Sequence, residues 1–475
     1  MSYLHGVETI ESESGGASVT IVKTAVIGLV GTAVGGAVNE IIVVSSDTDF
    51  AQFGPAATNS TIVDALNDIF DQKPTVVQVI NVLDPAVHNT AVTGELITLN
   101  AADEATLANP GVVTALAYDV KSKDGATTYT LDTDYTLDAL SGLVTRVVGG
   151  AIKAGATLSV DYSYADPSQV TAADIIGTIN EAGLRTGMQH FQDGYSLLGY
   201  FAKLLVAPVY STQDSVAEAL TTLATKIRAI SYRDAPAGLT PQQAITARGP
   251  AGTVNLYTSS ERAALCYPYV KVYDTDTDTN VLRPLSARAA GLQSMIDQTK
   301  GYWCSASNNE IQNIVGLERP IYAMVNDPNS ETNLLNAAGI ITVFSSFGTG
   351  YRLWGNRSAA YPASTQPTQF IPIRRTADII EESLEYFTLQ YVDGAVSNAL
   401  IDAVIESGKG FLRKLTGDGA VLDGNVWYDA KLNPTTQLES GWIQFSYDFM
   451  PPPPAERITY RANINVNYLS KLGSN

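Results

Sequence analysis

Four consecutive prolines occupy positions 451–454, close to the carboxyl end of the chain. Proline has a fixed φ angle and no backbone N–H, so this run forms a stiff, extended spacer of about 3.1 Å per residue. Behind the spacer, polar residues alternate with a row of apolar ones: Ile458, Tyr460, Ala462, Ile464, Val466 and Tyr468. This alternation is typical of a β-strand with one buried face.

A strand in this place needs a partner for its backbone groups and for its apolar face. One possible partner is the chain's own sheet, and the other is a sheet of a neighbouring molecule that gains this segment as an added strand. The rigid spacer favours the neighbour. A second alternating segment, at 442–449, predicts a strand ahead of the prolines, with one apolar face formed by Ile443, Phe445, Tyr447 and Phe449.

The body of the chain follows an α/β pattern. Apolar, β-branched segments at 19–30 and 75–82 flank a helix that Ser60 can cap, which predicts a βαβ unit. The pattern resumes at Val170, with strands expected near 203–207, 229–232 and 340–344, and helices from about 212, at 284–298 and at 331–337. Residues 86–167 have short alternating segments and Gly-containing turns instead, which indicates an inserted all-β domain.

We therefore expect a multi-domain α/β protein: an α/β core with an inserted all-β domain, an α+β C-terminal domain and extended N- and C-terminal arms. The predicted boundaries are 1–19 for the N-terminal arm, 20–85 with 168–360 for the core, 86–167 for the insertion, 361–450 for the C-terminal domain and 451–475 for the C-terminal arm.

Charge and composition narrow the classes of function. The chain has 48 acidic and 29 basic residues, a net charge of −19, whereas a protein that binds duplex nucleic acid needs a basic face. Charged residues make up 16% of the chain, below the ~25% of a typical soluble domain, which hints at assembly. Two cysteines make no disulfide framework. No segment has the length of a membrane helix and no secretory signal is visible, so we expect a soluble protein from a reducing cytoplasm.

Enzyme and metal motifs are incomplete. Glycines at 28, 31, 35 and 36 follow a strand, but their GxxGxxxG spacing is not the GxGxxG of a dinucleotide loop, so a structural turn is favoured over an α/β nucleotide-binding enzyme. Asp274, Asp276, Asp278 and Asn280 imitate the start of a calcium loop that lacks the required Gly and Glu, which favours an acidic hairpin tip. We predict no catalytic, cofactor-binding or metal-binding residue.

Each of two groups of basic residues can be interpreted in two ways. Arg352 and Arg357 lie in the segment YRLWGNR, where they either pair with local carboxylates or face a neighbouring subunit. Lys409, Arg413 and Lys414 form either a solvated helix face or a docking patch for an acidic partner.

Several further segments stand out beside YRLWGNR at 351–357: GYWCSASNNEI at 301–311, His5-Gly6-Val7, the strand expected at 18–31 with VIGLVGTA, LLVAP at 204–208 and NLLN at 333–336. Together these segments resemble contractile phage tail sheath proteins, including those of P2-like phages and R-type pyocins. YRLWGNR is the most recognisable of them. In GYWCSASNNEI, Ala306 and Asn309 stand where the family usually has Pro and Lys.

The resemblance implies a structural subunit that forms hexameric rings, stacked helically around a tail tube protein, with no cofactor. The arms of neighbours would join the C-terminal sheet, where Ile443, Phe445, Tyr447 and Phe449 would receive them. Lys409, Arg413 and Lys414 become candidate tube contacts. Further implied partners are baseplate and tail terminator proteins, and the implied location is a virion tail, assembled in the bacterial cytoplasm, that contracts to drive the tube through a cell envelope. A tailocin or secretion-system sheath would use the same subunit.

Overall fold

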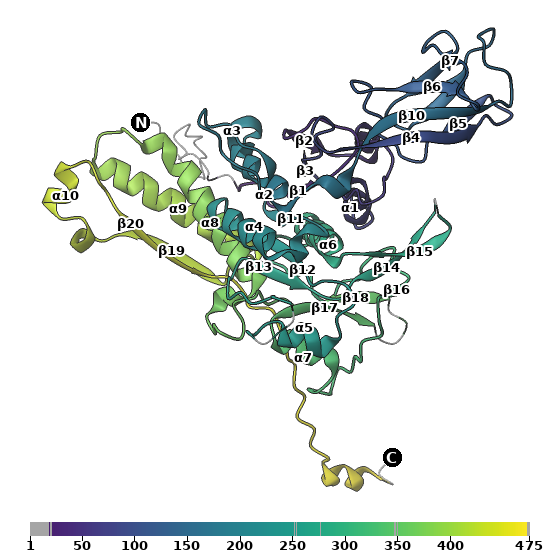
Figure 1. Cartoon of the computed structure of the whole chain (residues 1–475). Coiled ribbons are helices and arrows are strands. Elements are labelled where there is room, and N and C mark those ends of the chain that lie inside the picture. Colours follow the sequence, from purple (N-terminus) through teal and green to yellow (C-terminus); the bar gives the residue numbers. More distant parts are fainter. Residues whose placement is uncertain are drawn as a thin grey trace, which may run out of the picture.

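The computed structural model describes residues 19, 21–250, 252, 254–275, 277–345, 348 and 350–472. An eight-stranded sheet lies at its centre (Figure 1). The strand order is β18 (Tyr351–Trp354), β17 (Ile340–Ser345), β13 (Ala263–Cys266), β12 (Ile230–Asp234), β11 (Leu204–Val206), β1 (Ile27–Gly31), β3 (Val77–Asn81) and β2 (Ile41–Val44). The inner strands are parallel, and β18 and β2 at the two edges are antiparallel to their neighbours.

Helices cover both faces of this sheet. Helices α1 (Ile62–Phe70) and α6 (Leu285–Thr299) pack on one face, and α4 (Asp214–Lys226) packs on the other with the short α2 (Ala172–Ile176). Three shorter helices are α3 (Gly194–Leu198), α5 (Pro241–Thr246) and α7 (Glu331–Ala337), and a small sheet is formed by β14 (Val270–Asp274), β15 (Thr279–Arg283) and β16 (Gly316–Leu317). As predicted, the strands of the parallel sheet come from both sides of the all-β insertion in the sequence, because β3 and β11 both pair with β1.

The first predicted strand is shorter than expected. Strand β1 begins only at Ile27, whereas the apolar pattern predicts a strand from residue 19. Val19 and Val22 instead pack against the C-terminal helices, so their apolar character reflects a different buried surface. The rest of the predicted N-terminal arm lies outside the described residues.

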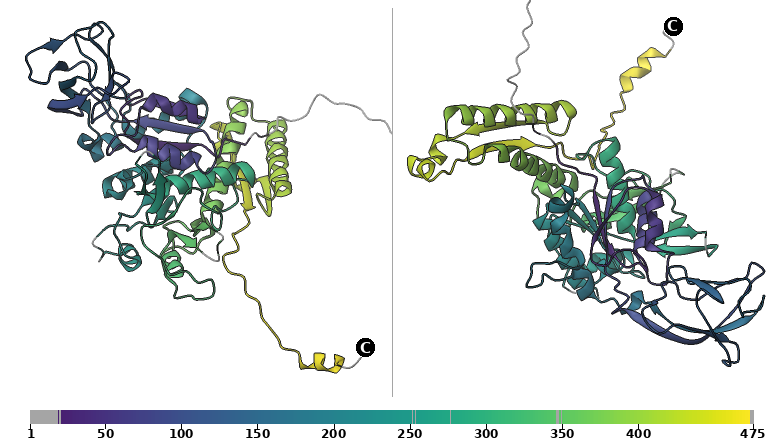
Figure 2. Two further views of the ribbon diagram at one scale, coloured as in Figure 1. Left: turned by 90° about the vertical axis from the view of Figure 1, so that its right-hand side faces the viewer. Right: turned by 90° about the horizontal axis from the view of Figure 1, so that it is seen from above.

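Residues 89–165 form only strands and turns and project from the body (Figures 1 and 2). A four-stranded sheet has the order β4 (Asn89–Thr98), β10 (Thr157–Ala165), β6 (Asp119–Ser122) and β7 (Thr128–Tyr129). A three-stranded sheet has the order β5 (Glu104–Thr106), β9 (Leu143–Arg146) and β8 (Tyr135–Asp138). The two sheets enclose a core of their own, which includes Val120, Val144 and Tyr162.

The C-terminal part contains α8 (Ile371–Thr388), α9 (Asn398–Asp418), β19 (Asp423–Tyr428), α10 (Thr435–Glu439) and β20 (Phe445–Met450). Helix α9 is continuous through Gly408. A Cβ atom at Gly408 would lie 2.9 Å from Cγ2 of Val426, so this glycine allows α9 to pack closely on β19. The chain then leaves the body as an irregular segment that ends in the 3₁₀ helix η8 (Val466–Lys471) (Figure 2).

Candidate assembly interface

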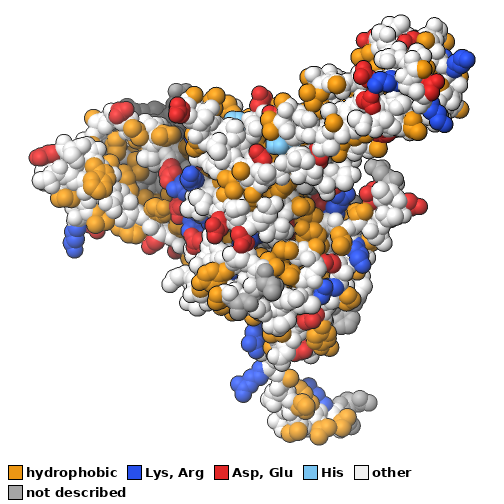
Figure 3. Space-filling view, in the orientation of Figure 1, with side chains coloured by type: hydrophobic (Ala, Val, Ile, Leu, Met, Phe, Trp, Pro, Cys, Tyr) orange, Lys and Arg blue, Asp and Glu red, His pale blue; other side chains and the backbone are white. Residues whose placement is uncertain are grey.

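Residues 458–468 pair with no strand of their own chain among the residues that the structure describes. The segment has no strand in the single chain: residues 451–465 are irregular, and Val466 and Tyr468 lie in η8. A strand at 458–468 on the sheet of a neighbouring molecule stays a prediction. The apolar side chains of this segment are open to solvent, with Ile458 72%, Tyr460 92% and Ile464 91% exposed, and Ala462 is exposed too (Figure 3). A strand forms only where a second strand completes its hydrogen bonds, and the single chain supplies none here.

The predicted receiving strand exists with a later start. Strand β20 begins at Phe445, so Ile443 precedes the strand and is not part of the sheet. Phe445 and Phe449 are half-buried, while Tyr447 is 39% exposed and stacks on Phe449 with ring centroids 6.0 Å apart. Strand β20 pairs with β19 alone, and neither strand has a second neighbour among the residues that the structure describes. Both edges of this two-stranded sheet are therefore available for an added strand.

The basic residues of α9 lie on its outer side. Arg413 and Lys414 are exposed, and Lys409 is partly exposed with its Nζ 3.8 Å from Oε1 of Glu406. An ion pair of this kind on an open helix surface contributes little to stability. These side chains are free to meet a partner, and their role as tube contacts stays a prediction.

The two arginines of YRLWGNR both have partners in their own chain. Arg352 donates from Nη1 to the backbone oxygen of Asn308 at 2.8 Å. Arg357 forms an ion pair with Glu456, just behind the prolines. Arg357 thus pairs with a carboxylate of its own chain, whereas Arg352 binds a backbone oxygen and not a carboxylate. A contact with a neighbouring subunit stays a prediction for both.

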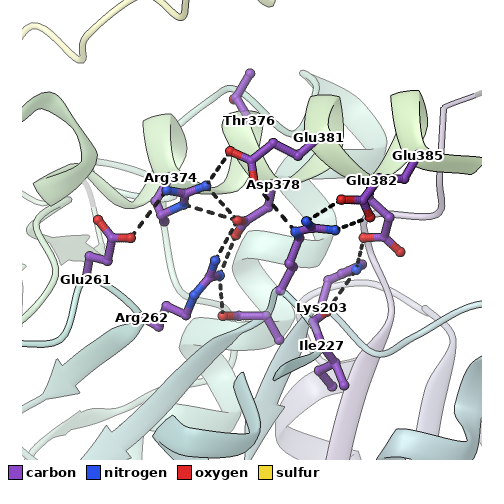
Figure 4. Close-up of polar contacts among 12 residues, drawn as sticks. Lys203, Ile227, Glu261, Arg262, Arg374, Thr376, Asp378, Glu381, Glu382 and Glu385 are labelled. Atoms are coloured by element: carbon purple, nitrogen blue, oxygen red, sulfur yellow. Dashed lines mark hydrogen bonds and ion pairs between the residues drawn. The ribbon is translucent and has the colours of Figure 1, made fainter. Parts of the chain in front are cut away.

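A group of buried ion pairs joins α8 to the core (Figure 4). The Asp378 carboxylate accepts hydrogen bonds from Nη1 and Nη2 of Arg262 at 2.6 and 2.7 Å, and from Nη2 of Arg374 at 2.8 Å. Lys203 at the start of β11 pairs with Glu382, and burial lowers the pKa of Lys203 while the Glu382 charge opposes that shift. Loss of one partner would leave the other charge buried and unpaired, which is strongly destabilising, so these pairs fix the position of α8 against the core.

Sequence reasoning missed these ion pairs. The acidic residues of α8 are visible in the sequence, but Lys203 lies 179 positions from Glu382 and Arg262 lies 116 positions from Asp378. No local spacing relates residues so far apart. The only available signal is the density of opposite charges at 374–385, which suggests ion pairs within the helix.

Neighbouring side chains fill the space beside the glycines that suggest a nucleotide-binding loop. A Cβ atom at Gly28 would lie 2.7 Å from Cδ2 of Leu205, and one at Gly31 would collide with Oγ1 of Thr61. The segment after β1 leads to strand β2 and not directly to a helix. The glycines thus allow close approach of neighbouring elements, and no phosphate cradle is formed.

Asp274 ends β14 and Thr279 begins β15, and the two strands pair antiparallel, as the hairpin interpretation predicts. Asp276 lies outside the described residues. Among the residues that the structure describes, no group of three His, Cys, Asp or Glu side chains is placed to hold a metal ion. Within the same residues no helix has the length and apolar character needed to cross a bilayer.

Comparison with known proteins identifies the class to which this fold belongs. Residues 183–359 match the phage tail sheath protein central domain, and residues 363–465 match the phage tail sheath C-terminal domain. Residues 84–174, which include the projecting sheets, match a separate family of unknown function. The chain belongs to the phage tail sheath protein family.

Individual relatives agree with this assignment. The chain is 50% identical over 473 residues to the tail sheath protein of Burkholderia phage BcepMu, which covers 99% of this chain and 98% of the relative. It is 28% identical to the tail sheath protein of Escherichia phage P2, over 64% of this chain and 73% of that protein. The helical sheath of the anti-feeding prophage in its contracted state has the same fold, with a TM-score of 0.60 and 15% identity over 98% of this chain and 100% of that one.

The expected resemblance to P2-like sheaths is confirmed. The protein is a structural subunit of a tail sheath and not an enzyme, because its relatives are structural sheath proteins. It is a component of a phage-like tail.

Proposed function

We propose that this subunit forms hexameric rings that stack helically around a tail tube, and that its C-terminal arm links the rings by strand addition. The observation that carries the proposal is the exposed alternating segment 458–468, combined with the two open edges of the β19–β20 sheet. An arm from one copy can complete its hydrogen bonds on a sheet edge of the next copy, and its apolar face can cover the half-buried Phe445 and Phe449 there.

The rest of the proposal follows from the shape of the subunit. Backbone pairing resists pulling along the strand, while the segments beside it let rings rotate and approach. The body, with α8 fixed by buried ion pairs, moves as one piece when body–body contacts change in contraction. The sheath thereby drives the tube through the cell envelope when the baseplate triggers it.

Two further partners and a site of assembly complete the proposal. The basic residues Lys409, Arg413 and Lys414 face the tube, where a more acidic partner surface would attract them. Baseplate and tail terminator proteins bind the two ends of the sheath. The particle assembles in the bacterial cytoplasm.

The test of strand addition changes one face of the arm at a time. Ile464→Asp places a charge on the apolar face and should abolish long tubes, because a buried unpaired carboxylate opposes pairing. Asn463→Asp adds the same charge to the neighbouring polar face and should leave tubes intact. Electron microscopy and sedimentation of the purified chains measure the result. Removal of residues 458–475 should likewise leave a folded body that no longer polymerises, and normal tubes from this truncated chain would refute the mechanism.

A further inference from the structure

The first residues of the C-terminal arm, unlike the rest of it, are attached to the body. Pro451 is buried, and residues 454–457 line a hollow of about 480 Å³. The carboxylate of Glu456 accepts hydrogen bonds from Nε of Arg357 at 2.9 and 3.0 Å, and Nη2 of Arg357 donates to the same group. Only two residues later, Ile458 is 72% exposed.

Arg357 is itself held from several sides by the body. Its Nη1 donates to Oε1 of Gln369 at 3.2 Å. The guanidinium carbon lies 4.0 Å from the ring centroid of Tyr361 and 4.9 Å from that of Phe370. A guanidinium that is fixed before it pairs loses little freedom when it binds a carboxylate in this forked geometry.

We propose that Arg357 is the positioning residue of the C-terminal arm: by holding Glu456 it sets the point and direction from which the strand-forming segment leaves the body. This inference rests on the proposed strand addition. With Glu456 held, the free span before Ile458 is two residues, at most about 7 Å. With Glu456 released, the last buried residue before Ile458 is Pro451, and the span becomes seven residues, at most about 25 Å.

The length of the free span matters because it sets the effective concentration of the arm near a neighbour's sheet. A short, directed tether keeps the strand where it can pair, whereas a longer one spreads it over a larger volume. The arm and the YRLWGNR segment therefore act together to place the strand-forming segment, although 99 positions separate Arg357 from Glu456.

The experiment uses the full chain and measures both the anchor and assembly. A nitroxide label at Thr459→Cys, in a Cys304→Ser background, reports the motion of the arm. The variants are Glu456→Gln, which lies in the arm and leaves the body untouched, Arg357→Gln, and the charge-swapped pair Arg357→Glu with Glu456→Arg. Arg146→Gln is the control, since Arg146 pairs with Asp103 at 2.7 Å within the projecting sheets, away from the arm.

We expect a mobile label in both single variants, a concentration for tube formation that rises about tenfold, and partial recovery of both in the charge-swapped pair. The control should match the unchanged chain. Unchanged label motion in both Glu456→Gln and Arg357→Gln would overturn the anchor, and a mobile label with unchanged assembly would overturn its positioning role. A separate experiment tests strand addition itself: normal tubes from the chain that lacks 458–475 would show that strand addition does not link the rings.

Discussion

Asp234 ends strand β12 inside the body, and its carboxyl group faces the first turn of α6. It accepts hydrogen bonds from the backbone N of Ser286 at 2.8 Å and from the Ser286 hydroxyl at 2.5 Å, while the Ser211 hydroxyl lies at 3.3 Å. Burial raises the pKa of Asp234 to about 6, although the Ser286 hydrogen bonds act in the opposite direction. The hydrogen bonds from Ser286 thus stabilise the charged carboxylate of Asp234, burial destabilises it, and burial is the larger effect.

Asp234→Asn should flatten the dependence of stability on pH. The pKa of Asp234 is higher in the folded chain than in the unfolded chain, where it is about 3.9. The contribution of this group to folding is therefore complete below pH ~4 and is lost as pH rises through about 6. A difference of about two pKa units corresponds to about 3 kcal/mol. Urea unfolding between pH 4 and 7.5 should show a smaller decline for Asp234→Asn than for the exposed control Asp132→Asn, and equal slopes would contradict the assignment.

Helix α8 connects the C-terminal part to the core through side chains of very different exposure. The Asp378 side chain is 3% exposed and shares its carboxylate between Arg262 and Arg374. About two turns further on, the Glu385 side chain is 58% exposed and pairs with Arg228 at 2.6 Å. The two ion pairs have similar distances but differ in the solvent around them.

Exposure, and not distance, should decide the effect of removing each acid. Asp378→Ala leaves two arginines without their buried partner and should lower the free energy of unfolding by about 3–5 kcal/mol. Glu385→Ala on the same helix should lower it by less than about 1 kcal/mol. Urea unfolding of the two variants measures the difference, and similar losses would show that the Asp378 pairs do not hold α8 to the core.

The elements that sequence predicts best are those with a strong local period. Helix α6, expected at 284–298, is observed at Leu285–Thr299, and α7 is observed over the range expected. The strand expected from residue 19 begins eight residues later, because β-branched residues fill a tertiary contact just as they fill a strand. Contacts between distant residues, such as Lys203 with Glu382 and Arg357 with Glu456, depend on the fold itself and leave no local pattern.

At the scale of the whole molecule, the chain is a compact body with parts that extend in different directions (Figures 1 and 2). The prolines and the alternating residues predict an arm that extends from the body. They do not predict that the arm is unpaired in the single chain, because a sequence pattern shows which strand a segment can form and not whether a partner strand is present. The projecting sheets were predicted from the change of period at residue 86. Their core is separate from that of the body, so the two parts fold around different sets of side chains.

Excision of the projecting sheets should leave a body that folds and still polymerises. Asn89 pairs with Ala165, and the N–H of Asp166 donates to the backbone oxygen of His88 at 3.0 Å, so the two connections lie side by side. An Asn-Gly turn can therefore replace 89–165. The excision uncovers Val34, which costs about 1.5–3 kcal/mol if that side chain becomes fully exposed.

The excised chain keeps both open edges of the β19–β20 sheet and the whole arm. Every element that strand addition needs is therefore still present. Electron microscopy should show tubes of smaller outer diameter than those of the full chain, and thermal unfolding should show a cooperative transition at a somewhat lower temperature. A folded, excised chain that forms no tubes would mean that 89–165 takes part in linking subunits. In that case the arm alone would not be sufficient to join one ring to the next.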